Sequence, residues 1–126
     1  MIRLRDLGEF EMIDLIAHHQ PAARGRLIKG IGDDCAVIAG DGDQVTVVTT
    51  DTMVEGVHFD LTTSTPEGLG AKLLAVNLSD IAAMGGAPRE AFLTMSASPD
   101  FDATILERLV GGLQASGFRF GVQLAG

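Results

Sequence analysis

Cysteine, long apolar runs and an export signal are what this sequence of 126 residues lacks. Its single cysteine, Cys35, excludes a disulfide within the chain. No stretch approaches the roughly 20 apolar residues of a membrane span. The first residues combine basic with acidic side chains, without the apolar segment and small-residue cleavage site of a targeting peptide. These absences predict a cytoplasmic protein that does not associate with membranes.

Basic residues are also scarce: Lys and Arg number 9 against 17 Asp and Glu, for a net charge of −8 at pH 7. This balance argues against a nucleic-acid surface and indicates that phosphates would be met through bound cations. Neither the P-loop motif nor the Gly-x-Gly-x-x-Gly dinucleotide motif is present. A hydrophobic content of 46% with 21% charged residues is typical of one soluble globular domain.

Periodicity of the apolar residues predicts a mixed α/β fold with the element order α-β-β-α-β-α-β. A helix over residues 9–19 should end at Gln20-Pro21, and the glycine-rich turn 40–43 should join two strands into a hairpin. Residues 24–30 are predicted to be a polar, basic connector. The remaining predictions are strands at 35–39 and 45–50, a helix from Ser64-Thr65-Pro66-Glu67 to about Met84, a strand at 91–98, a helix at 103–116 capped by Asp102 and stopped by Gly117, and a last strand at 121–126.

Three segments place carboxylates beside hydroxyl groups or small residues: 30–34, 47–59 and 77–80. Hard divalent cations such as Mg²⁺ prefer carboxylate, hydroxyl and carbonyl oxygens, and they bridge protein carboxylates to phosphates. A soft-ligand site is not indicated, because Cys35 stands alone and the three histidines have no metal-binding spacing with it. The three segments together therefore predict a shared magnesium site that handles a nucleotide.

Each segment taken alone also has a simpler interpretation. Thr49 and Asp51 share one face of an extended chain and Thr50 the other, which equally describes a strand that ends in a solvated turn. Asp33-Asp34 after a glycine is compatible with an ordinary turn. Asp80 lies on a helix near apolar residues, where burial would demand a cation or hydrogen bonds, or else it faces water.

The sequence leaves alternative roles for two further side chains. His58, between Val57 and Phe59, is either a histidine packed against the core or a substrate contact in the loop that follows the metal-binding strand. Lys72 neutralises Asp80, neutralises a phosphate oxygen, or only packs its aliphatic stem.

Segments 8–10, 30–36, 49–59 and 75–85, in this order, closely resemble the bacterial thiamine-monophosphate kinases. The resemblance implies the mixed N-terminal domain of the aminoimidazole ribonucleotide synthetase-like fold, whose sheet dimerises into a barrel-like core. Residues 1–126 would be this ATP-binding, magnesium-binding and dimerisation domain. A C-terminal domain, absent from this chain, would complete the active site.

The resemblance also implies an activity in thiamine diphosphate biosynthesis: ATP would phosphorylate thiamine monophosphate, with metal-assisted, electrostatic catalysis and no protein nucleophile. His58 matches a position that contacts the thiamine substrate. Gly126 matches the start of a nucleotide-binding Gly-Asp step, in which Ala125 replaces a preceding glycine of the family pattern. Alternatives are a catalytically incomplete, dimerising nucleotide-binding module and a superfamily member with another phosphate acceptor. The positions that match the magnesium cluster are Asp34, Thr49, Thr50, Asp51 and Asp80.

Overall fold

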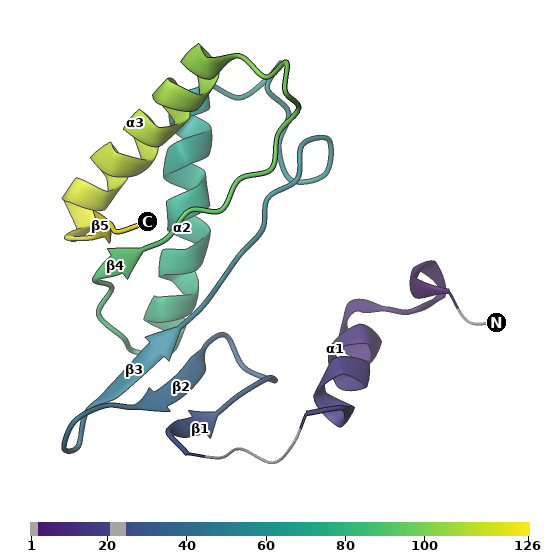
Figure 1. Ribbon diagram of the computed structural model, residues 1–126, viewed down its shortest axis with the longest axis vertical. Coiled ribbons are helices and arrows are strands. Elements are labelled where there is room, and N and C mark those ends of the chain that lie inside the picture. Colours follow the sequence, from purple (N-terminus) through teal and green to yellow (C-terminus); the bar gives the residue numbers. More distant parts are fainter. Residues whose placement is uncertain (1–2, 21–24) are drawn as a thin grey trace. The chain divides into compact units, whose positions relative to one another are not determined.

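The computed structural model describes residues 3–20 and 25–126, so Pro21 and Arg24 of the sequence predictions lie outside the described residues. The chain divides into two compact units, Met1–Thr49 and Thr50–Gly126. The first holds a short 3-10 helix η1 (Leu4–Asp6), helix α1 (Glu9–His18) and strands β1 (Leu27–Lys29), β2 (Ala36–Ala39) and β3 (Val45–Val48). The second holds α2 (Pro66–Ala83), β4 (Glu90–Ala91), α3 (Ala103–Phe120) and β5 (Gln123–Leu124). The fold class is mixed α+β (Figure 1).

The first unit contains the predicted hairpin. Strands β2 and β3 are antiparallel, with Ala36 opposite Val48 and Ala39 opposite Val45. The prediction of a connector over residues 24–30 was wrong, because β1 joins the sheet in the order β1-β2-β3. Pairing with β2 gives this basic segment a partner: the Ala39 N–H donates to the Arg26 carbonyl at 2.7 Å, and the Arg26 guanidinium donates to the Ala39 carbonyl at 2.6 and 2.8 Å.

Helix α2 begins one residue later than the sequence suggests. The N-cap is Thr65 rather than Ser64, since the Thr65 hydroxyl accepts the Gly68 N–H at 3.1 Å and Pro66 occupies the first turn. Leu69 and Leu74 are the buried leucines of the helix, because they lie on the face that meets α3.

Helix α3 starts as predicted and ends later. The Asp102 carboxylate accepts the Thr104 N–H at 2.8 Å, and this hydrogen bond lowers the pKa of Asp102. The helix runs through Gly117 and stops at Gly121, which adopts a left-handed conformation with φ +69°. Gly117 is needed for a different reason: a Cβ there would lie 2.7 Å from the Val122 carbonyl oxygen. The predicted stop at Gly117 was therefore wrong.

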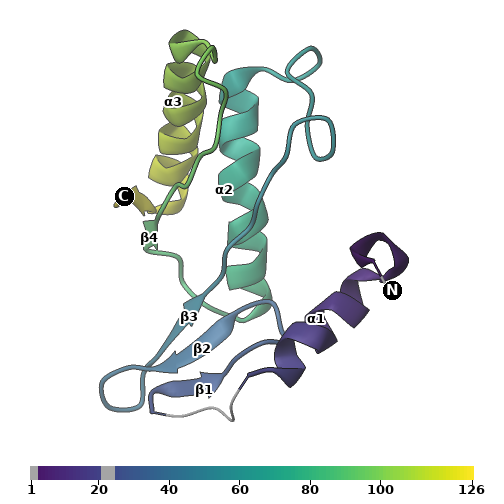
Figure 2. The same cartoon turned by 45° about the vertical axis from the view of Figure 1, so that its right-hand side comes forward.

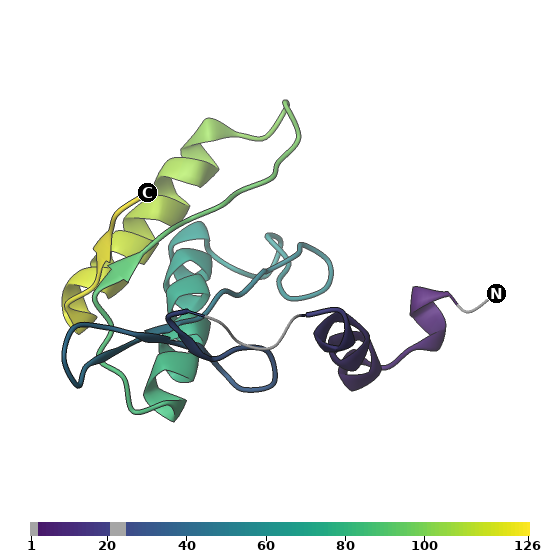
Figure 3. The ribbon, with the colours of Figure 1, turned by 60° about the horizontal axis from the view of Figure 1, so that its bottom comes forward.

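The sheet of the second unit is short. Strands β4 and β5 are parallel, with Glu90 opposite Gln123 and Ala91 opposite Leu124 (Figure 3). The ladder ends where the Leu93 N–H donates to the Gly126 carbonyl at 2.8 Å. The predicted strand over residues 91–98 was wrong in extent, because the alternating pattern beyond Leu93 continues past the residues that pair with it.

Helices α2 and α3 lie side by side and form the core of the second unit (Figures 1 and 2). Glycines allow the two backbones to approach closely. A Cβ on Gly70 would lie 2.0 Å from the Leu109 carbonyl oxygen, and a Cβ on Gly112 would lie 2.1 Å from the Glu67 carbonyl oxygen. Neither clash could be relieved by a side-chain rotation, because the obstructing atoms belong to the backbone. Leu69, Leu74, Leu109 and Leu113 are buried around this contact.

An ion pair joins the same two helices at their surface. The Arg108 guanidinium donates to both Glu67 carboxylate oxygens, at 2.6 and 3.0 Å. These hydrogen bonds lower the pKa of Glu67 below its ordinary value of 4.5 and raise the pKa of Arg108. Two parallel hydrogen bonds fix the orientation of the guanidinium relative to the carboxylate, so the pair links α2 and α3 in one geometry.

The lowered pKa of Glu67 gives stability a defined pH dependence. A carboxyl with a lowered folded-state pKa contributes stability above its unfolded-state pKa, and the contribution is lost as the pH falls through the folded-state value. We expect Arg108→Met to melt below the wild type at neutral pH, and the two melting temperatures to converge in acid as Glu67 is protonated. Thermal melts by circular dichroism across this range measure the difference. A gap that stays constant from neutral pH to about pH 3 would contradict an electrostatic role for the pair.

Candidate ligand-binding site

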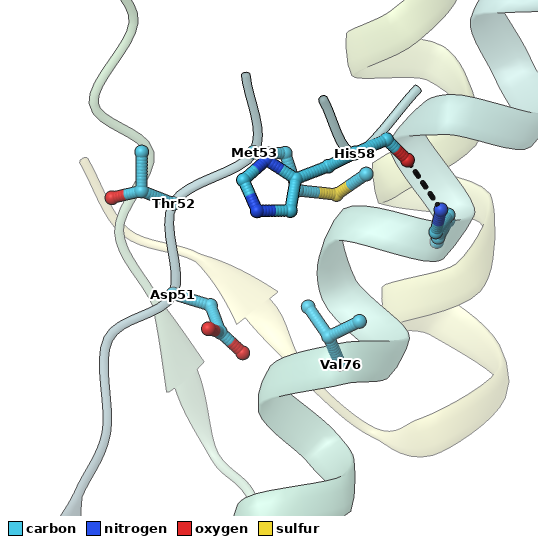
Figure 4. A pocket seen from close by; sticks show the side chains of 6 residues that line it. Asp51, Thr52, Met53, His58 and Val76 are labelled. Carbon is cyan, nitrogen blue, oxygen red and sulfur yellow. Dashed lines mark hydrogen bonds between the residues drawn. The ribbon is translucent and has the colours of Figure 1, made fainter. Parts of the chain in front are cut away.

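A shallow pocket of about 170 Å³ opens beside α2 in the second unit (Figure 4). One wall comes from the extended segment that begins this unit, and the other comes from the helix. A carboxylate, a hydroxyl group, an imidazole and an ammonium group therefore meet around one apolar floor. The lining residues are Asp51, Thr52, Met53, His58, Lys72 and Val76.

Two of the sequence-predicted site residues share this pocket. Asp51 and His58 are seven positions apart, and both are exposed to solvent. In Figure 4 the Asp51 carboxylate lies across from Val76 of α2, and the His58 ring lies farther along the same wall. The structure therefore brings together a predicted magnesium ligand and the predicted substrate contact. The interpretation of His58 as a core histidine was wrong, because its side chain is exposed.

Asp80 lies on the same helix as two of the residues that line the pocket. Lys72 and Val76 line the pocket, and Asp80 follows Val76 by four residues, so the three side chains lie along one face of the helix. Asp80 is half-buried, which lies between its two sequence interpretations of burial and full exposure. Asn77 takes no part in this row, since its amide donates to the Leu73 carbonyl at 3.0 Å.

The predicted metal ligands are divided between the two units. Asp34 and Thr49 belong to the first unit, whereas Thr50 belongs to the second together with Asp51 and Asp80. Asp34 is exposed, and its neighbour Asp33 is bonded locally. The Asp33 carboxylate accepts hydrogen bonds from the Lys29 ammonium group and from the Asp34 N–H, which together lower the pKa of Asp33.

Gly126, the predicted nucleotide-binding residue, lies at the end of the β4–β5 ladder. Its carbonyl accepts the Leu93 N–H at 2.8 Å, and a Cβ at this position would lie 3.0 Å from the Phe92 ring. The Ala125 N–H donates to the Ala91 carbonyl, also at 2.8 Å. The segment that would lead into the Gly-Asp step is thus held as part of a small parallel sheet.

The chemistry of the donor set fits magnesium. The predicted ligands offer only carboxylate and hydroxyl oxygens, which suit a hard divalent cation. Within residues 3–20 and 25–126, however, no three His, Cys, Asp or Glu side chains gather closely enough to hold a metal ion. The metal site therefore stays a prediction, based on the types of oxygen ligand that the sequence provides.

Three lining residues were not predicted from the sequence as members of the site: Thr52, Met53 and Val76. Lys72 was left open, and its ammonium group donates to the His58 carbonyl at 2.8 Å (Figure 4). A usable signal existed for Val76, because it lies four residues after Lys72 and four before Asp80, so all three fall on one helical face. No sequence signal paired Lys72 with the backbone of the His58 loop.

The chain has a mixed α+β fold, and its second unit carries a pocket lined by polar and apolar side chains. Residues 32–126 match the family described as "AIR synthase related protein, N-terminal domain", and the chain belongs to this family. Within the described residues, no helix combines the length and the apolar character needed to cross a membrane.

The curated relatives of the chain include thiamine-monophosphate kinases, which confirms the family resemblance found in the sequence. The kinase of Aquifex aeolicus is 37% identical over 113 residues, covering 90% of this chain and 34% of the relative. The kinase of Mycobacterium tuberculosis is 37% identical over 125 residues, covering 98% of this chain and 36% of the relative. The chain thus spans about a third of the length of these relatives.

Solved structures give the same picture. One described as "AaThiL complexed with AMPPCP and TMP" superposes with a TM-score of 0.86 at 34% identity, covering all of this chain and 38% of that one. Thiamine-monophosphate kinase from Stenotrophomonas maltophilia K279a superposes with a TM-score of 0.57 at 34% identity, over 90% of this chain and 34% of that one.

Proposed function

We propose that this chain is the N-terminal part of a thiamine-monophosphate kinase, in which it binds the metal ions of the nucleotide and the thiamine monophosphate. The observation that carries the proposal is the pocket shared by Asp51 and His58, one predicted to hold metal and the other substrate. The relative solved with AMPPCP and TMP supports this pairing of ligands. AMPPCP is an analogue of ATP, and we take TMP to be thiamine monophosphate.

The reaction would transfer the γ-phosphoryl group of ATP to the phosphate of thiamine monophosphate, forming thiamine diphosphate and ADP. Both reactants are anions, and this chain carries a net charge of −8. Bound Mg²⁺ would supply charge neutralisation for the phosphates. In our proposal, Asp34, Asp51 and Asp80 hold the ions with the hydroxyls of Thr49 and Thr50, while His58 orients the acceptor. Catalysis rests on positioning and electrostatics, without a protein nucleophile.

A second candidate has its own supporting observation. Because the chain spans about a third of its relatives, it can act as a binding module that is catalytically incomplete by itself. We expect this behaviour of the 126 residues alone. A superfamily member that phosphorylates a different acceptor is the third possibility, and acceptor competition in the complete gene product distinguishes it.

We further propose that the chain forms a cytoplasmic homodimer through its three-stranded sheet. Support comes from apolar side chains that the sheet exposes: Ile28 and Val45 are 58% and 54% exposed, and Val48 is 44% exposed. Burial of these side chains against the sheet of a second copy would remove apolar surface from water. Sedimentation equilibrium of the wild type and of Val45→Lys measures the association, and a wild-type monomer at all accessible concentrations would contradict it.

Calorimetric titration of the 126-residue chain tests the ligands. We expect thiamine monophosphate and Mg-AMPPCP to bind, with the nucleotide requiring Mg²⁺, and a parallel assay to detect no thiamine diphosphate from the chain alone. Turnover by the chain alone would refute the need for a further domain. Failure of both ligands to bind would count against the proposed sites.

A further inference from the structure

The loop of residues 54–59, which carries His58, is a compact turn closed by its own backbone. The N–H groups of Val57 and His58 both donate to the Val54 carbonyl, at 3.2 and 2.8 Å. The Gly56 N–H donates to the Phe59 carbonyl at 2.8 Å, and Gly56 has φ +76°, a conformation that side chains rarely adopt. The turn therefore has a defined shape before any ligand is considered.

The imidazole of His58 fastens the same turn. The Val54 N–H donates to Nδ1 of His58 at 2.9 Å. A backbone N–H can only donate, so Nδ1 must carry the lone pair, and the ring proton of the neutral imidazole lies on Nε2. The ring is thereby fixed in one tautomer, with Nε2–H left to act as a donor.

Lys72 connects this turn to helix α2. Its ammonium group donates to the carbonyl of His58 at 2.8 Å, across 14 positions of sequence. Among the described residues, the ion pairs join Arg5 to Asp6, Lys29 to Asp33 and Arg108 to Glu67, so the Lys72 charge is directed to a backbone carbonyl rather than to a carboxylate. The bond reaches the main chain of His58, so it acts on the position of the whole residue.

We propose that Lys72 is a positioning residue: it ties the His58 turn to α2 so that a neutral imidazole presents Nε2–H to an acceptor atom of the ligand in the Asp51 pocket. In this proposal Lys72 has neither of the two charge-neutralising roles that the sequence left open, toward Asp80 or toward a phosphate oxygen. The ligand part of this inference rests on the proposed function. The tautomer and the tether stand without it.

The tautomer is measured on the unliganded 126-residue chain. Long-range ¹H–¹⁵N correlation spectra of the imidazole, recorded in mildly alkaline buffer, distinguish the two neutral forms. We expect a protonated Nε2 and an unprotonated Nδ1. A protonated Nδ1 would overturn the proposed presentation of the ring.

Backbone amide hydrogen exchange tests the tether, again without ligand. Lys72→Met should accelerate exchange in residues 54–59 while the interior of α2 keeps its protection, and Lys72→Arg should restore it in part. Lys29→Met removes the same charge from the other unit and is the matched control. Unchanged exchange in Lys72→Met would overturn the tether.

A double-mutant cycle with thiamine monophosphate separates positioning from direct contact. We expect Lys72→Met to weaken binding by roughly fivefold, in proportion to the lost population of the binding-competent turn. In the His58→Ala background the same change should have no further effect, because no imidazole remains to be placed. Equal losses in both backgrounds would show that Lys72 contacts the ligand itself. If even the wild type does not bind, the proposed function fails, while the spectra and the exchange data still decide the tether.

Discussion

Gly112→Ala is expected to destabilise the protein strongly, whereas Gly111→Ala should stabilise it. A Cβ on Gly112 would lie 2.1 Å from the Glu67 carbonyl oxygen and 2.5 Å from the Glu67 Cα, so the helices α2 and α3 must separate. Overpacking of this kind costs about 1–3 kcal/mol or more. At Gly111, one position along the same helix, a Cβ has no neighbour within 4 Å. Alanine there should add about 0.5–1 kcal/mol through helix propensity.

Thermal and urea unfolding of the two variants beside the wild type measures this contrast. The melting temperatures should move in opposite directions, by roughly 10 °C or more downward for Gly112→Ala and a few degrees upward for Gly111→Ala. Should Gly112→Ala fail to fold, that loss is itself the result expected from the close approach, and a folded Gly111→Ala protein shows that a methyl group at the neighbouring position is tolerated. A Gly112→Ala protein as stable as the wild type would contradict the close approach of the helices.

Asp51→Asn in the complete gene product is expected to lower magnesium-dependent turnover by roughly 10²- to 10³-fold, since metal-borne charge stabilisation is worth several kcal/mol. The amide keeps the size of the carboxylate and removes its charge. Asp51 lines the pocket that also holds His58, so the change acts where nucleotide metal and acceptor are proposed to meet.

Steady-state rates across a magnesium titration measure this effect. Asp100→Asn removes the same charge from an exposed position in the loop before α3 and should leave the rate within about twofold, as expected for surface charges remote from a site. The Asp51 variant should also need more Mg²⁺ for half-maximal activity. Near-normal turnover at low Mg²⁺ would remove Asp51 from the metal site.

Local signals in the sequence predicted much of this fold. Capping by Asp102 and the hairpin around residues 40–43 follow from short-range chemistry, and both are confirmed. Strand β1 could not be predicted in this way, because a segment of only three residues, Leu27–Lys29, becomes a strand only through its pairing with β2. The strand predicted over residues 91–98 was too long for a related reason. Its alternating pattern covers eight residues, whereas β5 offers only a short partner strand for pairing.

For the candidate site too, the residue types could be predicted from the sequence and the tertiary contacts could not. Oxygen donors in segments 47–59 and 77–80 were visible as residue types, and the structure places Asp51 and His58 in one pocket. Gly117 was misread as a stop because its requirement is tertiary, set by the Val122 carbonyl. The role of Lys72 could not be predicted for a related reason. Its acceptor is a backbone carbonyl 14 residues away, and every residue has such a carbonyl, so the sequence does not indicate which one is the partner.

Thiamine diphosphate formation by the complete gene product tests the proposed activity. The protein would be incubated with ATP, Mg²⁺ and thiamine monophosphate, beside separate reactions with other phosphate acceptors, and the products would be separated by chromatography. We expect magnesium-dependent conversion of thiamine monophosphate to thiamine diphosphate with matching release of ADP. Phosphorylation of a different acceptor, with thiamine monophosphate left unchanged, would contradict it.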